Sequence, residues 1–129
     1  METDMMKVFM IGIGGAAGCI CRYWVSSLSQ RVFDNPFFPY GTLTVNVVGC
    51  LLIGFLGGIS ETRQIFSPEV RVLIFIGFLG GFTTFSTFGY EIFMAARDGQ
   101  FIPALVNLLF HLVLGFGSVW LGFSLSKLF

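Results

Sequence analysis

The stretch from Gly80 to Phe88, with the sequence GGFTTFSTF, lies in the middle of an apolar segment long enough to cross a bilayer. Two adjacent glycines followed by four hydroxyl residues disfavour a continuous helix. Glycine is about 1 kcal/mol worse than alanine in a helix interior, and Ser and Thr offer the backbone alternative hydrogen bonds. In hydrocarbon a break survives only where protein, water or an ion satisfies the freed backbone groups. The sequence therefore predicts a membrane helix broken near residues 80–84, with a site at the break.

The composition is that of a membrane protein. Of 129 residues, 55% are hydrophobic and only 11% are charged, whereas a soluble domain carries about 25% charged residues. The length accommodates about four spans of about 20 residues each, with little left for a soluble domain. We predict an all-α fold in which residues 1–129 form a single four-helix transmembrane domain. The spans are expected at approximately 7–28, 41–59, 68–97 and 103–127.

Composition also limits the partners and the location. The formal net charge is zero, which gives no basic surface for nucleic acid. Three cysteines in apolar segments are an odd number, which does not form a disulfide framework, so we interpret them as core residues. The first apolar run continues too long for a cleavable signal, and we interpret it as the first span. The expected location is the cell inner (plasma) membrane, as a multi-pass protein surrounded by lipid.

Small residues and capping residues indicate how the helices pack and begin. Gly14 with Gly18, and Gly54 with Gly58, are spaced to form faces on which helices approach closely. Ser67 followed by Pro68 is a typical helix start, with Ser as the N-cap and Pro at the first helical position. Loops are expected at residues 30–40, 60–67 and 98–100.

The cations are nearly balanced between the two sides of the predicted bundle. One side has four cations, which are Lys7, Arg63, Arg71 and Lys127. The other side has three, which are Arg22, Arg31 and Arg97. Because an excess of Lys and Arg sets orientation, a chain without one can insert either way up. We therefore predict dual topology and an antiparallel homodimer.

Two polar residues within the spans have more than one interpretation. Asn46 can form interhelical hydrogen bonds, worth about 0.6 kcal/mol on average in a membrane, or it can donate to an anion. Glu91 is the only carboxylate well inside a span. It can pair with Arg22, hydrogen-bond to backbone as a protonated acid, or carry a proton or cation. Arg22 itself, near the end of the first span, is explained by snorkelling.

Residues of the third and fourth spans extend the set of candidates. Asn107 and His111 are four residues apart and share one helical face. A single His is a weak indication of a metal site, so a hydrogen-bonding stripe is the favoured interpretation over a metal ligand or proton shuttle. Phe85 and Phe88 are core residues or line a pore, where positively polarised ring edges would hold an anion weakly, as conduction requires.

The helix break also exposes carbonyl oxygens, which favour a cation. In a two-fold dimer, two carbonyls from each chain between Gly80 and Thr83 would place four oxygens around one ion. Na⁺ suits such a hard oxygen site, where it would be structural and not transported.

These motifs together resemble the Fluc/CrcB fluoride channels. GGFTTFSTF at residues 80–88 is similar to the family's GG-x-TTFSTF signature. GTLTVNVVG at 41–49 resembles GTL-x-VN-x-x-G, and the first span resembles GG-x-x-G-x-x-x-RY. The match covers the first three spans in order and spacing. It implies a dual-topology antiparallel dimer with two pores.

The resemblance also implies roles for individual residues. The carbonyls of Gly80 and Thr83 correspond to those that hold a central Na⁺, and Phe85 and Phe88 correspond to the paired pore aromatics. The remaining correspondences are Asn46 as the pore asparagine, Ser86 and Thr87 as the hydroxyl track with Thr42 as a weaker member, and Glu91 as the acid after the signature. The fourth helix departs from the family, since Asn107 and His111 stand where many members have Tyr and Ser.

The function that follows is passive, selective export of cytoplasmic fluoride by a channel. The alternative is a small dual-topology, proton-coupled multidrug or cation antiporter. That class needs a titratable carboxylate in its first span, and this span has none after Asp4. No catalytic constellation is present: the single His has no evident nucleophile partner and there is no phosphate-binding loop, so an enzyme is not expected.

Overall fold

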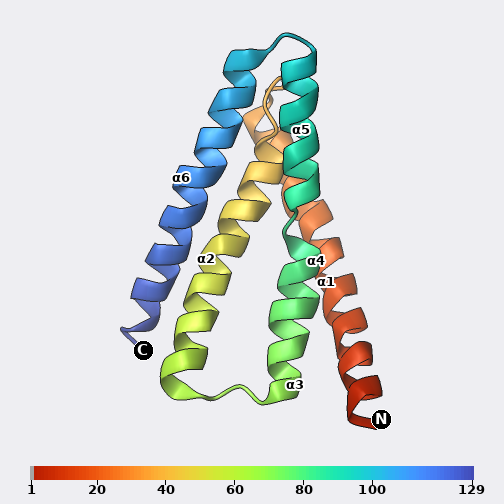
Figure 1. Ribbon diagram of the computed structural model, residues 1–129, viewed down its shortest axis with the longest axis vertical. Helices are drawn as coiled ribbons and strands as arrows, with labels where there is room; N and C mark the ends of the chain where they lie inside the picture. The colour runs from red at the N-terminus through yellow and green to blue at the C-terminus, as the bar shows by residue number, and fades with distance from the viewer. Residues whose placement is uncertain (1) are drawn as a thin grey trace.

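A computed structural model describes residues 2–129, and every regular element in that range is a helix (Figure 1). Four segments are long and apolar enough to cross a membrane, which confirms the predicted all-α fold with four spans. The first, second and fourth spans are the helices α1 (Glu2–Phe33), α2 (Tyr40–Arg63) and α6 (Phe101–Ser126). The third is divided into α3 (Pro68–Arg71), the π-helix η1 (Val72–Phe78), α4 (Leu79–Phe82) and α5 (Phe85–Arg97).

Helices α1 and α2 are longer than the predicted spans, and the helix break is shorter than predicted. The first helix extends to both sides of 7–28, the second runs past 59, and the fourth begins at Phe101. Apolar patterning marks the part of a helix within hydrocarbon, whereas the hydrogen-bonded helix continues into the polar boundary. The break covers only Thr83 and Thr84, because Gly80 and Gly81 remain helical in α4. The prediction of a break near 80–84 was therefore too wide.

The connections follow local backbone chemistry. The Ser67 hydroxyl oxygen accepts a hydrogen bond from the Val70 amide at 3.3 Å, with Pro68 at the helix start, which confirms the predicted N-cap. The link between α5 and α6 contains Gly99 with a φ of 79°, a left-handed conformation that glycine adopts without steric cost. This short link places α5 and α6 side by side.

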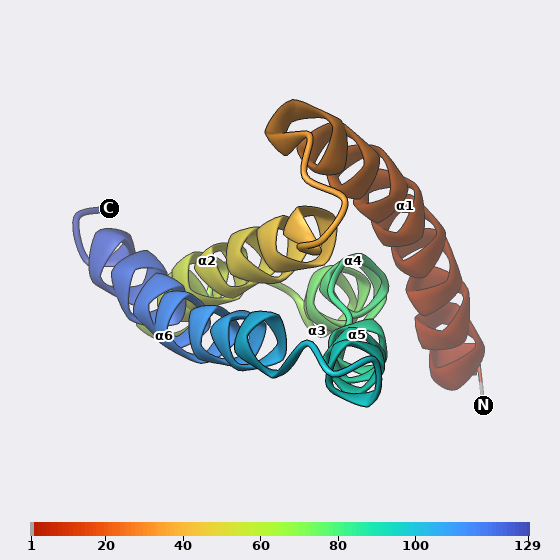
Figure 2. The same ribbon diagram turned by 90° about the horizontal axis from the view of Figure 1, so that it is seen from above.

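The two halves of the third span pack against different helices. The first half, η1 and α4, lies against α1, whereas α5 packs mainly on α6. Helix α6 also makes the most extensive contact of the fold, with α2 (Figure 2). The break thus lets one span leave α1 and join α6 partway through the bundle.

Glycines make the closest helix contacts possible. A Cβ added to Gly18 would overlap the carbonyl oxygen of Phe78, and one added to Gly14 would overlap that of Leu73. Similarly, Gly54 lies against the backbone of Val119 on α6. The predicted close-packing faces of the first two helices are therefore confirmed.

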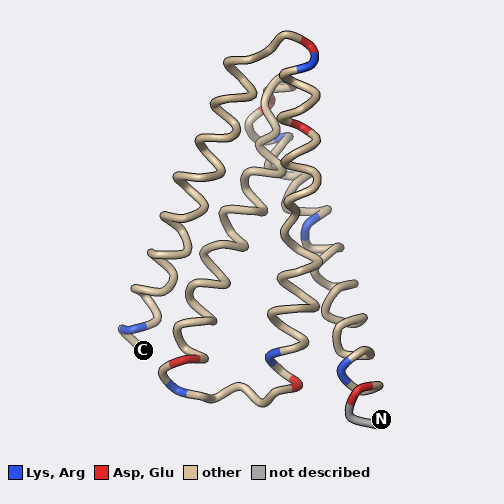
Figure 3. Tube along the Cα trace, in the orientation of Figure 1, with Lys and Arg blue, Asp and Glu red and all other residues tan. Residues whose placement is uncertain are grey.

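Charged residues gather mainly at the two ends of the bundle (Figure 3). Both termini lie at the same end as the α2–α3 connection, and the other two connections lie at the opposite end (Figure 1). This separation leaves a largely uncharged middle, as a protein embedded in hydrocarbon requires.

Candidate functional site

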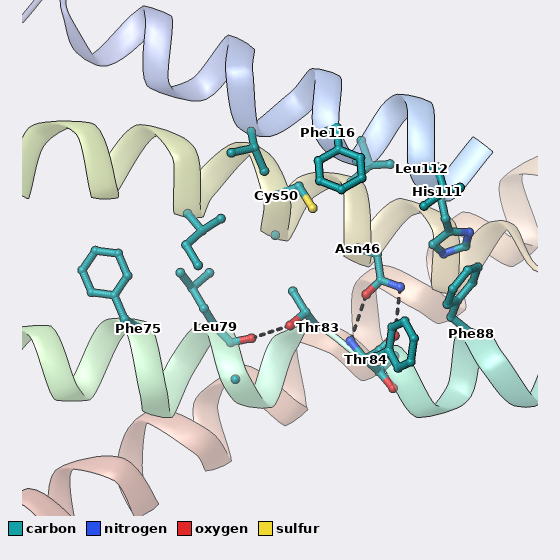
Figure 4. Close-up of a pocket in the computed structure, with 17 residues that line it drawn as sticks. Asn46, Cys50, Phe75, Leu79, Thr83, Thr84, Phe88, His111, Leu112 and Phe116 are labelled. Carbon is teal, nitrogen blue, oxygen red and sulfur yellow. Dashed lines mark hydrogen bonds between the residues drawn. The ribbon is translucent and has the colours of Figure 1, made fainter. Parts of the chain in front are cut away.

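The break at Thr83 and Thr84 is held by one side chain of α2. Both residues have extended backbone, with φ and ψ of −87° and 163° for Thr83 and −153° and 118° for Thr84. Asn46 pairs with Thr84 in both directions. Its Nδ2 donates to the Thr84 carbonyl at 2.9 Å, and its Oδ1 accepts from the Thr84 N–H at 2.9 Å (Figure 4). One amide thus replaces two backbone bonds that the break removes.

Gly49 explains why the broken segment can lie so close to α2. A Cβ at this position would overlap the methyl group of Thr83. Asn46 and Gly49 are three residues apart and so share a helical face. One residue of this pair fixes the break, and the other leaves room for it.

The break removes the helical donors of several carbonyl oxygens, among them those of Gly80 and Thr83. In a continuous helix the Thr84 N–H would donate to the carbonyl oxygen of Gly80, but here it donates to Asn46 Oδ1. The Thr87 N–H would likewise bond Thr83, but it is given to the Thr84 hydroxyl, the N-cap of α5, at 3.2 Å. The carbonyl of Gly81, by contrast, accepts from the Cys19 thiol at 3.6 Å. The carbonyls of Gly80 and Thr83 are therefore available to another partner.

A pocket of about 440 Å³ lies between α2, α6 and the broken span (Figure 4). Its walls are mainly apolar, and its polar lining comes from Asn46, Thr83, Thr84 and His111. The carboxamide nitrogen of Asn46 has two N–H groups, of which Thr84 uses one. The pocket thus combines a free hydrogen-bond donor with a low-dielectric wall.

The two candidate phenylalanines have different surroundings. Their ring centroids are 5.6 Å apart, with the planes inclined by 60°. Phe88 is buried, whereas Phe85 is 84% exposed in the single chain. Both line the pocket, but only Phe88 is covered by other residues of this chain.

Polar groups of α5 and α6 meet beside Phe88. His111 packs on the Phe88 ring at a centroid distance of 4.1 Å, and its Nδ1 is 3.1 Å from the Asn107 carbonyl oxygen. Three buried side-chain atoms in the described chain have no hydrogen-bond partner: Glu91 Oε2, Asn107 Oδ1 and His111 Nε2. Unpartnered polar atoms are rare in protein interiors and expensive in a membrane, which makes this cluster a candidate site for water or an ion.

Glu91 is joined to α2 through Thr42. The Thr42 hydroxyl donates to Glu91 Oε1. The pair with Arg22, one of the alternatives considered for Glu91, is not formed in the part of the chain that the structure describes; Arg22 Nη2 instead lies 3.5 Å from Cys19 Sγ. The structure thus gives Glu91 a hydroxyl partner, Thr42, which was not among the alternatives considered from the sequence.

Two of the three residues of the predicted hydroxyl track, Thr42 and Thr87, line one pocket, and the third, Ser86, lies outside it. A second pocket of about 270 Å³ is lined by Arg22, Thr42, Thr84 and Thr87, together with two serines of α1. Ser86 is exposed and belongs to neither pocket. Thr84 lines both pockets, and its hydroxyl donates to that of Thr87 at 2.9 Å.

Thr84 and Cys50 are site residues that the sequence reasoning missed. Thr84 is the N-cap of α5, and its side chain accepts a hydrogen bond from the Thr87 N–H. Thr is a preferred N-cap residue, so its position just before an apolar helix was a usable sequence signal. Cys50 lies one turn after Asn46 on α2 and lines the same pocket. No sequence signal distinguished Cys50 from an ordinary core cysteine.

The Asn46 pairing leads to a stability prediction. Asn46→Ala leaves both the N–H and the carbonyl of Thr84 without their partner, so unfolding in detergent should become easier by about 1–3 kcal/mol. Thermal unfolding of the purified variant measures this. Val48→Ala, a truncation on the same helix, is the matched control. An Asn46→Ala variant as stable as Val48→Ala would contradict the role assigned to the pairing.

Comparisons with known proteins extend over almost the whole chain. A family model described as "CrcB-like protein, Camphor Resistance (CrcB)" matches residues 9–123. Proteins named "Fluoride-specific ion channel FluC" are similar at 43% identity in Geotalea daltonii, 41% in Methylobacillus flagellatus and 43% in Maridesulfovibrio salexigens. The alignments cover 95–96% of this chain and 97–98% of those relatives. This chain therefore belongs to the CrcB family, whose members are ion channels and not enzymes.

Proposed function

We propose that this protein is a multi-pass membrane channel that exports cytoplasmic fluoride passively. The observation that carries the proposal is the cluster of unpartnered buried atoms on Glu91, Asn107 and His111. Such atoms persist in a membrane where water or an ion passes. The names of the aligned relatives identify fluoride as the ion.

The chemistry of the pocket suits a small, strongly hydrated anion. Fluoride enters a narrow path only if donors replace its water, and the second N–H of the Asn46 carboxamide is such a donor. Phe88 adds an aromatic edge, which attracts an anion weakly and so does not trap it. A negative-inside potential drives the anion outward by about 2.3 kcal/mol per charge per 100 mV.

Fluoride efflux from proteoliposomes tests this function. Vesicles loaded with potassium fluoride should release it when valinomycin provides a path for the counter-ion, as measured with a fluoride electrode. Vesicles loaded with chloride should retain it, and protein-free vesicles set the background. Proton-driven efflux of an organic cation, without fluoride release, would instead support the antiporter alternative.

We also propose that the working unit is an antiparallel homodimer. In the single chain Phe85 is 84% exposed, and the surroundings of Gly80 are open, because no atom outside its own stretch of helix lies within 4 Å of where its Cβ would be. Both residues line the pocket, so a second copy would complete its open side. The balance of four cations against three favours insertion in both orientations.

Orientation is measured by labelling single cysteines in intact cells. In a background without Cys19, Cys21 and Cys50, a cysteine introduced at Gly99 should be partly accessible to an impermeant thiol reagent from outside. A second cysteine at Gln64, in the connection at the opposite end, should be labelled to a similar extent. Complete labelling of one site and none of the other would rule out dual topology.

A structural Na⁺ fits the backbone at the break. The carbonyl oxygens of Gly80 and Thr83 have lost their helical donors, and two antiparallel chains would together offer four oxygens. No group of three or more His, Cys, Asp or Glu in the described chain could hold a metal, so such a cation would rely on backbone oxygens. Bound there, Na⁺ would supply positive charge that stabilises the break.

Sodium removal tests this assignment with a readout other than flux. Replacing Na⁺ by choline at constant ionic strength should lower the thermal unfolding temperature of the purified protein, and returning Na⁺ should restore it. Choline is too large to enter a site formed by carbonyl oxygens. Equal unfolding temperatures in the two cations would argue against a bound Na⁺.

A further inference from the structure

His111 occupies an unusual position for a residue beside an anion pathway. Its Nδ1 lies 3.1 Å from the Asn107 carbonyl oxygen, which can only accept a hydrogen bond. The proton of the neutral imidazole therefore resides on Nδ1. The other nitrogen, Nε2, then carries a lone pair, and it is buried without a partner. In this state Nε2 repels an anion.

Protonation reverses the character of Nε2. The imidazolium donates from both nitrogens, so the bond to Asn107 is kept while Nε2 becomes a positively charged N–H donor. We propose that His111 forms a fluoride-binding position only when Nε2 is protonated, so that fluoride passage rises as the pH falls. This inference rests on the proposed fluoride channel. The proton comes from water and returns to water, and fluoride binds and leaves as the same ion.

The groups around the ring are compatible with a cationic state. The Phe88 ring, 4.1 Å away between centroids, lies within the range in which aromatic rings attract cations. On α2, the backbone of Thr42 lies near the imidazole but forms no hydrogen bond with Nε2, and the Thr42 hydroxyl donates to Glu91 on α5. Glu91 is thus an acidic group that is separated from His111 by Thr42.

The remaining titratable neighbour is Cys50. It lines the same pocket from α2 and faces Gly115, one helical turn beyond His111 on α6. Neither Lys nor Arg lines this pocket, so no fixed cation competes with the imidazolium there. Glu91, Cys50 and His111 are therefore the groups whose titration must be separated by experiment.

Fluoride current across a planar bilayer provides the first test. Current is the suitable measure because neutral HF, which crosses lipid unaided at low pH, carries no charge. As the pH is raised, the current should fall by about tenfold over about two pH units around the midpoint of the imidazole titration. His111→Ser, whose hydroxyl donates at any pH, should lose this dependence whatever the size of its current. Cys50→Ala is the control that should retain it.

A second test uses the unsubstituted protein and does not depend on flux. The sequence has one histidine, so ¹⁵N-histidine labelling reports His111 alone by NMR. Because binding linkage is reciprocal, fluoride should shift the midpoint of the imidazole titration to higher pH, and equal chloride should not.

The outcomes separate the inference from the function on which it rests. A pH-independent fluoride current, a dependence that survives His111→Ser, or a titration that fluoride leaves unmoved would each overturn the role of His111 while keeping the channel. Absence of fluoride current from the unsubstituted protein at every pH would instead overturn the channel function itself.

Discussion

The pairing of Asn46 with Thr84 is the interaction on which the rest of the structure depends. A membrane offers no water to the two backbone groups of Thr84, so an extended residue at this depth requires a partner for each. A carboxamide is the side chain that can donate to a carbonyl and accept from an N–H at once. The two 2.9 Å bonds meet that requirement from a neighbouring helix, and Gly49 allows the approach.

Several functional features follow from this break. Because the Thr84 N–H is directed to Asn46 and the Thr87 N–H to the cap, two carbonyls are left for a cation. The same break moves the third span from α1 to α6, which brings Phe88 against His111. Cation site and anion pathway are thus proposed on one interrupted helix, a few residues apart.

Sequence reasoning placed some of these features and misplaced others. The paired glycines at Gly80 and Gly81 indicated a break, but they remain helical, because intrinsic propensity is a weak guide where tertiary bonds decide. Glu91 was considered with Arg22 and is found with Thr42. Both partners lie far from Glu91 in sequence, so only the packing of α5 on α2 could select one.

The sequence by itself determined four apolar spans, the glycine faces and the presence of a costly irregularity in the third span. Each of these features depends on residues close together in the chain, through their hydrophobicity, spacing and helix propensity. Only the tertiary structure decided that Thr84 is the residue held by Asn46, and that Nε2 of His111 is left without a partner. These facts depend on which helix faces which, and that is set by packing among residues distant in the chain.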